Sequence, residues 1–168
     1  MALASSSQEE FIFLEEVKVL CAGHAGSRLS WHAYFGSLAL LAAARSPCER
    51  LHVGCVLVRE NRVLSMGYNG FFSGAPHESI VDNGHEQATV HAEQNAIAHA
   101  ARTGVAVEKA HAYVTHYPCV NCFKSLVAAG VTKVYYVDDY RNDDVVATLS
   151  RYAKVPLHKL SQQQPLRN

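Results

Sequence analysis

Apolar side chains recur along the chain with two periods, and these predict both helices and strands. Apolar residues at helical spacing over 11–20 and over 31–46 predict two helices. Val53–Val58 and Val63–Gly67 are apolar runs separated by a short polar turn, which predicts a β-hairpin.

From Tyr68 to Thr89 the composition changes to Gly, Asn, Ser, Pro, Asp and His, which predicts a long loop without a core of its own. Loops of this length in compact domains are usually either functional or disordered. We expect further helices over 92–101, 119–129 and 143–152, and further strands over 110–115, 134–137 and 155–159. A hairpin followed by this alternation predicts a three-layer α/β/α fold, with a mixed sheet of about five strands flanked by helices.

The same pattern divides the chain into three segments. Residues 1–28 form an N-terminal extension, 29–160 a single domain long enough for one core, and 161–168 a polar C-terminal tail. The helix expected in the extension either packs on the domain or on a partner subunit, or is an appendage without a specific role.

Charge and cysteine content exclude several function classes. Lys and Arg number 15, as do Asp and Glu, so the formal net charge is zero and no global positive field attracts DNA or RNA. The apolar runs are too short or too charged to cross a bilayer. Five cysteines form an odd set without disulfide-framework spacing, and no cleavable signal peptide precedes them. We therefore expect a soluble cytoplasmic protein with no nucleic-acid or membrane partner.

Two short motifs carry the candidate chemistry. The first is His91-x-Glu93, and the second, further along the chain, is Pro118-Cys119-x-x-Cys122. The two cysteines are three residues apart at a predicted helix start, so both sulfurs lie on one face, where the helix dipole favours thiolates. With His91 they form a three-ligand zinc set, which leaves the fourth position open for water as in catalytic sites.

Glu93 lies beside this ligand set without belonging to it, and is the candidate proton shuttle. Zinc lowers the pKa of a bound water towards about 7, and such a water attacks C4 of cytosine once its protons are carried away. A redox Cys-x-x-Cys, or half of a closed structural zinc site, is the alternative. The pairing with His91-x-Glu93 favours a catalytic zinc, and the proline before the cysteines disfavours a redox role.

Several other stretches accompany the two motifs. They are Ser30-Trp31 with Tyr34-Phe35, Arg45-Ser46-x-Cys48-x-Arg50-x-x-Val53-Gly54, Gly67-Tyr68-Asn69-Gly70, Val90–Ile97, Tyr113–Cys122 with Lys124, and Val134-Tyr135-Tyr136 before Tyr140. Together these stretches, which span about residues 29 to 158, resemble the deoxycytidylate (dCMP) deaminase family. The Gly-Tyr-Asn-Gly element separates this family from tRNA adenosine and free-cytidine deaminases.

The resemblance implies a cytidine-deaminase-like fold, with residues 29–160 as the catalytic domain. It implies hydrolytic deamination of dCMP to dUMP, which supplies dUMP for thymidylate synthesis. Zinc would be held by His91, Cys119 and Cys122, and Glu93 would be the proton shuttle. Each of these roles is an expectation from the resemblance.

The resemblance also implies nucleotide contacts and regulation. Asn69 would contact the nucleotide sugar, and the turn that contains Gly70 would lie near an effector pocket. The family is typically a homohexamer that dCTP, with Mg, activates and dTTP inhibits. Independently, Arg50 and Lys124 are candidates for the monophosphate because phosphate favours Arg or Lys near helix ends; each is otherwise a surface charge.

A second, structural zinc is a further implication. Relatives often bind one between the Cys of the Arg-Ser-x-Cys element and the long loop, and Cys48, His77 and His85 match in kind and approximate place. The loop cysteines of relatives are absent, with Glu78 and Glu86 at neighbouring positions. A metal would tether a loop that has little apolar anchorage, whereas solvent-facing histidines are the alternative.

Other functions stay open on the sequence alone. The motifs fix the ring chemistry but not the phosphate number, so dCTP or a 5-substituted dCMP is an alternative substrate. A catalytically silent zinc-binding, nucleotide-sensing subunit is the alternative from another class, although such a subunit would not need Glu93. The neutral charge disfavours a polynucleotide substrate. Phe71 and Phe72 either stack on a base or pack beneath the loop.

Overall fold

The computed structural model describes residues 3–23, 26, 28–82 and 85–160, with side chains from residue 11 onward except that of His85. The chain divides into two compact units, residues 1–30 and 31–168. The first unit contains α1 (Leu3–Ala22), which is longer than the helix expected over 11–20. Among the helices of the described residues, none is long and apolar enough to cross a membrane.

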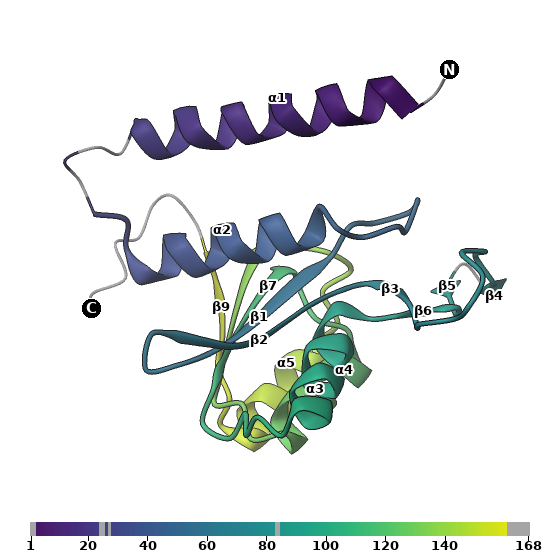
Figure 1. Ribbon diagram of the computed structural model, residues 1–168. Helices are drawn as coiled ribbons and strands as arrows, with labels where there is room; N and C mark the ends of the chain where they lie inside the picture. The colour runs from purple at the N-terminus through teal and green to yellow at the C-terminus, as the bar shows by residue number, and fades with distance from the viewer. Residues whose placement is uncertain (1–2, 24–25, 27, 83–84, 161–168) are drawn as a thin grey trace. The chain divides into compact units, whose positions relative to one another are not determined.

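The second unit is built on a five-stranded sheet (Figure 1) with the order β2-β1-β7-β8-β9. The strands are β1 (Gly54–Arg59), β2 (Arg62–Tyr68), β7 (His111–His116), β8 (Lys133–Asp138) and β9 (Leu157–Lys159). β1 pairs antiparallel with β2 and with β7, whereas β7, β8 and β9 run parallel. Glu60 and Asn61, between β1 and β2, have φ values of 52° and 57°, as a type I′ hairpin turn requires. The expected hairpin and mixed sheet are confirmed.

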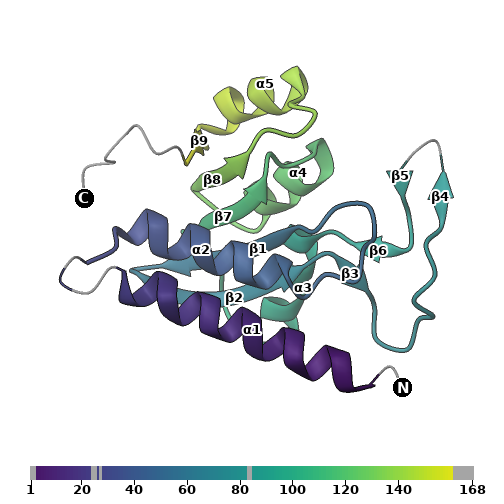
Figure 2. The ribbon, with the colours of Figure 1, turned by 90° about the horizontal axis from the view of Figure 1, so that it is seen from above.

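Helices cover both faces of this sheet (Figures 1 and 2). One face carries α2 (Trp31–Ala43), and the other carries α3 (Ala92–Thr103), α4 (Val120–Ala128) and α5 (Asp144–Ala153). Successive residues of β1 point to opposite faces, so Val56 packs with Phe35 of α2 and Leu57 packs in the same core as Phe123 of α4. The three-layer α/β/α fold is confirmed.

Two glycines allow helices to approach the sheet backbone closely. A Cβ at Gly54 would lie 2.0 Å from the carbonyl oxygen of Ala39 in α2. A Cβ at Gly67 would lie 2.4 Å from the carbonyl oxygen of Ala92, the first residue of α3. The first turn of α3, which follows directly on the His-x-Glu motif's histidine, therefore rests on β2.

The segment between β2 and α3 contains short strand pairs within the expected loop. β3 (Gly70–Phe71) pairs with β6 (Thr89–Val90), and β4 (Val81–Asp82) pairs with β5 (His85–Glu86). Strands of two residues are too short to produce a visible period in the sequence. The Phe71 ring stacks on His77 with centroids 5.1 Å apart, whereas Phe72 is exposed.

Candidate active site

His91 lies directly before α3, as its N-cap residue. Its backbone is extended, with φ −64° and ψ 150°, and its side chain makes no capping hydrogen bond. Its Nδ1 instead lies 3.3 Å from Cys122 Sγ and 3.7 Å from Cys119 Sγ. Because His91 is outside the helical spiral and Glu93 is within it, the two side chains can face the same space despite their spacing.

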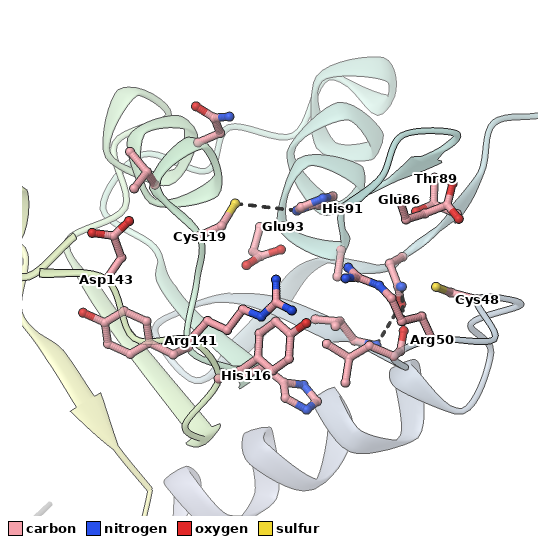
Figure 3. A pocket seen from close by; sticks show the side chains of 18 of the residues that line it. Cys48, Arg50, Glu86, Thr89, His91, Glu93, His116, Cys119, Arg141 and Asp143 are labelled. Carbon is pink, nitrogen blue, oxygen red and sulfur yellow. Dashed lines mark hydrogen bonds between the residues drawn. The ribbon is translucent and has the colours of Figure 1, made fainter. Parts of the chain in front are cut away.

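The two cysteines come from the start of α4. Cys119 is the N-cap residue, and its Sγ accepts a hydrogen bond from the backbone N–H of Cys122 at 3.5 Å. The starts of α3 and α4 thus present an imidazole and two sulfurs to one another, as Figure 3 shows for His91 and Cys119.

The spacing of these three ligand atoms fits a zinc ion. They all lie within 4.8 Å of one another, and they form the only such group of three among the residues that the structure describes. Tetrahedral zinc, with bonds of about 2.3 Å to sulfur and 2.0 Å to nitrogen, requires nitrogen–sulfur distances of about 3.5 Å. The observed distances of 3.3 and 3.7 Å bracket that value. Three protein ligands leave one coordination position for a non-protein ligand.

The electrostatics of this group favour one thiolate in the absence of metal. The hydrogen bond from the Cys122 thiol lowers the pKa of Cys119 to about 4. The pKa of Cys122 is raised, because it donates that bond and is buried. The hydrogen bond with Cys119 raises the pKa of His91. Zinc requires both sulfurs as thiolates, so binding would release the proton that Cys122 retains.

Glu93 lies in the first turn of α3 and is only 4% exposed. Burial raises the pKa of its carboxyl above the usual range. Figure 3 shows its carboxylate beside His91 and Cys119, directed into the cavity. A raised pKa suits a carboxyl that alternately binds and releases a proton.

These groups open onto a cavity of about 620 Å³ (Figure 3), which is large enough for a nucleotide. The polar residues of its lining, besides His91, Glu93 and Cys119, include Cys48, Arg50, Asn69, Glu86, Thr89, His116, Asn121, Tyr140, Arg141 and Asp143. The parallel strands β7 and β8 both end at this edge of the sheet. Open α/β sheets bind ligands at the carboxyl ends of their parallel strands.

Comparison with known proteins decides the family. The family model of the cytidine and deoxycytidylate deaminase zinc-binding region matches residues 29–138. The chain belongs to this deaminase family. It is 39% identical over 137 residues to ComE operon protein 2 of Bacillus subtilis, and the aligned region covers 79% of this chain and 72% of the relative.

Two further relatives of this deaminase-family chain are informative. The deoxycytidylate deaminase of Saccharomyces cerevisiae is 38% identical over 144 residues, which cover 80% of this chain but only 46% of the yeast protein. The chain therefore spans less than half of that relative's length. The crystal structure of dCMP deaminase from the cyanophage S-TIM5, in complex with dCMP and dUMP, matches with a TM-score of 0.69. The match has 31% identity and covers 76% of this chain and 94% of that chain. The expected family and fold are confirmed.

The residues expected to contact the nucleotide in this deaminase-family chain lie in different surroundings. Arg50 lines the cavity, whereas Lys124 is exposed on α4 and, like buried Gly70 of β3, is not among the described lining residues. Asn69 lines the cavity, but its amide binds backbone: Nδ2 donates to the Leu51 carbonyl and Oδ1 accepts from the Val53 N–H, both at 2.8 Å.

The residues expected to bind a second zinc are only partly placed. Cys48 is buried and lines the cavity, and His77 stacks on Phe71. His85 belongs to β5, but its side chain lies outside the described residues. The second zinc therefore stays a prediction.

Glu86 stabilises the long loop. In the sequence it was noted only as a departure from relatives. Its Oε1 accepts hydrogen bonds from the backbone N–H groups of Ile80 at 3.2 Å and Ala88 at 2.8 Å. A hydrogen bond from the Ser79 side chain is the main cause that lowers the pKa of Glu86. An ionised carboxylate thus anchors the loop just before His91.

His116, Tyr140 and Arg141 also line the cavity, and the sequence assigned no role to them. The Arg141 guanidinium carbon lies 5.7 Å from the centroid of the Tyr140 ring, which also meets the His116 ring. Figure 3 shows Arg141 and Arg50 extending into the cavity from opposite sides. The available signal was the position of Arg141 soon after a parallel strand, since such strand ends gather at ligand sites.

Proposed function

We propose that this chain is a zinc-dependent deaminase that hydrolyses dCMP to dUMP and ammonia, and so supplies dUMP for thymidylate synthesis. The observation that carries the proposal is the His91, Cys119 and Cys122 group with buried Glu93 on a nucleotide-sized cavity. Support for dCMP comes from relatives, because the yeast relative is named deoxycytidylate deaminase and the cyanophage enzyme binds dCMP and dUMP.

Glu93 is the proposed proton carrier of the reaction. Zinc held by the three ligands would supply a water activated at neutral pH. In the hydrolysis, the water oxygen bonds to C4 of cytosine and the bond from C4 to the exocyclic nitrogen breaks. Glu93 carries one proton of the water to ring N3 and the other to the departing nitrogen, which leaves as ammonia. Its buried position beside His91 and Cys119 supports this role.

Arg50 and Arg141 are the proposed partners of the 5′-phosphate. Both line the cavity and extend into it from opposite sides (Figure 3). Guanidinium groups bind phosphate oxygens through short, charge-assisted hydrogen bonds. Lys124, a phosphate candidate from the sequence, is not among the described lining residues of the cavity. We therefore assign phosphate binding to Arg141 in its place.

Regulation and assembly are proposed on the family resemblance. We propose that dCTP, bound with Mg, activates the enzyme, that dTTP inhibits it, and that it assembles as a homohexamer. We propose a cytoplasmic location, which fits the supply of dUMP. It also fits the absence of disulfide bonds among the five cysteines, because the cytoplasm keeps thiols reduced. A second zinc on Cys48, His77 and His85 belongs to the same set of proposals.

A steady-state substrate panel tests the proposed function. Ammonia release by the zinc-loaded enzyme is measured with deoxycytidine, dCMP, dCTP and 5-methyl-dCMP, each with and without dCTP and dTTP as effectors. We expect the highest kcat/KM with dCMP. Preference for dCTP or 5-methyl-dCMP would reassign the substrate, and zinc-loaded protein without any turnover would support the silent nucleotide-sensing subunit.

The same protein tests the finer proposals. Hyperbolic kinetics with dCMP that do not respond to dCTP would remove the effector proposal. Metal analysis that gives about one zinc per chain, with no change in Cys48→Ser, would reject the second zinc site. Light scattering measures the size of the assembly.

A further inference from the structure

The turn after β8 carries Arg141 into the cavity in an uncommon backbone conformation. Arg141 has a φ of 42°, in the left-handed region that residues with a Cβ adopt at a cost in free energy. Such conformations persist where their surroundings impose them, and they gather at functional sites. This turn follows residues 29–138, the part that the family model matches.

Three side chains hold this turn in place. Asn142 Oδ1 accepts a hydrogen bond from the backbone N–H of Tyr140 at 3.0 Å, and Asn142 Nδ2 donates to Asp139 Oδ1 at 2.7 Å. The other carboxylate oxygen of Asp139 forms an ion pair with Lys159 Nζ. Because Lys159 is the last residue of β9, this ion pair joins the turn to the edge strand of the sheet. The hydrogen bond from Lys159 is the main cause that lowers the pKa of Asp139.

Aromatic rings support the Arg141 side chain from within the cavity. Its guanidinium lies over the Tyr140 ring, and that ring meets His116 edge-on at 5.9 Å and 82°. His116 Nδ1 lies at hydrogen-bond distance, 2.9 Å, from Thr115 Oγ1, which accepts the Gly54 N–H. The cation–π contact restricts the positions of the guanidinium, so Arg141 has a defined direction into the cavity (Figure 3).

We propose that Asp139, Asn142 and Lys159 form a latch that positions Arg141 to bind the 5′-phosphate of the substrate. None of the three is among the described lining residues of the cavity, so they are positioning residues. The latch rests on the proposed function, because it takes dCMP as the substrate. An exposed ion pair contributes little to global stability, so the main effect of this one is on the geometry of the turn.

Two variants open the latch at different points. Asp139→Ala removes the hydrogen bonds of the carboxylate with Asn142, Lys159 and Tyr136, and Lys159→Met removes only the connection to β9. We expect either variant to raise the KM for dCMP about threefold to tenfold, with kcat within about twofold and an unchanged Tm. The inhibition constant of dUMP should rise by the same factor, whereas that of deoxyuridine, which lacks the phosphate, should not change. Glu15→Ala is the matched control, because it breaks the exposed Glu15–Lys18 ion pair of α1.

Coupling to Arg141 separates positioning from a general structural role. In an Arg141→Ala background, Asp139→Ala should not raise the KM further, because no guanidinium remains to be positioned. The latch would be overturned if Asp139→Ala raised the KM by the same factor in the wild-type and Arg141→Ala backgrounds. Equal rises in the inhibition constants of dUMP and deoxyuridine would also overturn it. Wild-type enzyme that deaminates dCMP, together with unchanged KM in both latch variants, would overturn the latch alone. Wild-type enzyme that fails to deaminate dCMP would overturn the proposed function.

Discussion

Glu93 is the residue on which the proposed chemistry depends most directly. Glutamine has nearly the same shape as glutamate and fits the buried position, but it does not carry a proton at neutral pH. In Glu93→Gln we therefore expect kcat to fall about 10²- to 10⁴-fold, with zinc content and fold unchanged. Ammonia release, metal analysis and circular dichroism measure the three quantities.

The control for this substitution is Glu108→Gln, since Glu108 is exposed and is not among the described lining residues of the cavity. It should behave as the wild type. Near-normal turnover of Glu93→Gln, with zinc bound, would contradict the role of Glu93 as proton carrier.

Arg141 and Lys124 provide a matched comparison for phosphate recognition. We expect Arg141→Ala to raise the KM for dCMP about tenfold or more, because it removes charge-assisted hydrogen bonds to phosphate. Lys124→Ala should leave the KM unchanged, because Lys124 is exposed and lies outside the cavity lining. A rise in KM for Lys124→Ala alone would favour the residue that the sequence pattern selects.

Residues differ in how far the sequence could predict their place in the site. The sequence was sufficient to group His91, Cys119 and Cys122, because zinc selects His and Cys as ligands and the predicted helix starts place their side chains near one another. In the structure their ligand atoms lie together. Arg141 was missed because its direction depends on the turn after β8 and on contacts with β9, which is adjacent only in the folded sheet. Asn69 was identified, but its bonds to backbone could not be predicted from its sequence position.

At the scale of elements, the contact between β2 and α3 controls the position of His91 and Glu93. A Cβ at Gly67 would meet the carbonyl oxygen of Ala92 at 2.4 Å and the backbone nitrogen of Ala96 at 2.5 Å, so Gly67→Ala forces α3 away from the sheet. We expect this variant to lose about 1–3 kcal/mol of unfolding free energy and most of its activity. Urea unfolding and the dCMP assay measure both effects.

Gly23→Ala is the control for the backbone effect of replacing glycine, because a Cβ there meets its nearest atoms at ordinary contact distances of 3.5 and 3.6 Å. It should retain stability and activity. Wild-type activity in Gly67→Ala would show that the start of α3 tolerates displacement.

Most helices and strands of the second unit were predictable from their apolar spacing, whereas β9 has a single apolar residue, Leu157. Gly104 ends α3 as its C-cap residue with a φ of 71°, a left-handed conformation that favours glycine. The pairs β3–β6 and β4–β5 were not predicted, since each strand has two residues and its pairing partner is remote or separated by polar residues. The loop is also held by hydrogen bonds to the Glu86 carboxylate. No periodic pattern in the sequence marks such a contact.

For the whole molecule, the order of elements predicted the three-layer fold, but strand order comes only from the structure. The antiparallel pairing of β1 with β7 brings residues far apart in the sequence together, and it leaves β7, β8 and β9 as a parallel group. The end of β7 and the turn after β8 line the site. On the face of α2, this group also gathers three histidines around Tyr135. They are His32 of α2, His111 of β7 and His158 of β9, with ring centroids 4.5, 5.9 and 5.2 Å from Tyr135.

These histidines should make the stability of the whole fold depend on pH. Burial is the main cause that lowers the pKa of His32, His111 and His158, and Lys133 of β8 lowers each further. The unfolded chain, with histidine pKa values of about 6.5, then binds more protons than the folded chain as pH falls below that value. We therefore expect the free energy of unfolding to be largest above about pH 7 and to decrease on acidification through the folded pKa values.

Urea midpoints of the wild type and of a His111→Gln/His158→Gln variant, measured between about pH 7.5 and 5.5, test this linkage. The comparison isolates the histidines, because Glu93 and the metal ligands titrate equally in both proteins. The variant should lose less stability than the wild type on acidification, since two groups that must remain neutral in the fold are gone. His52→Gln, which replaces an exposed histidine outside the Tyr135 cluster, should keep the wild-type slope. Identical slopes in the wild type and the double variant would mean that the cluster does not set the acid sensitivity of the fold.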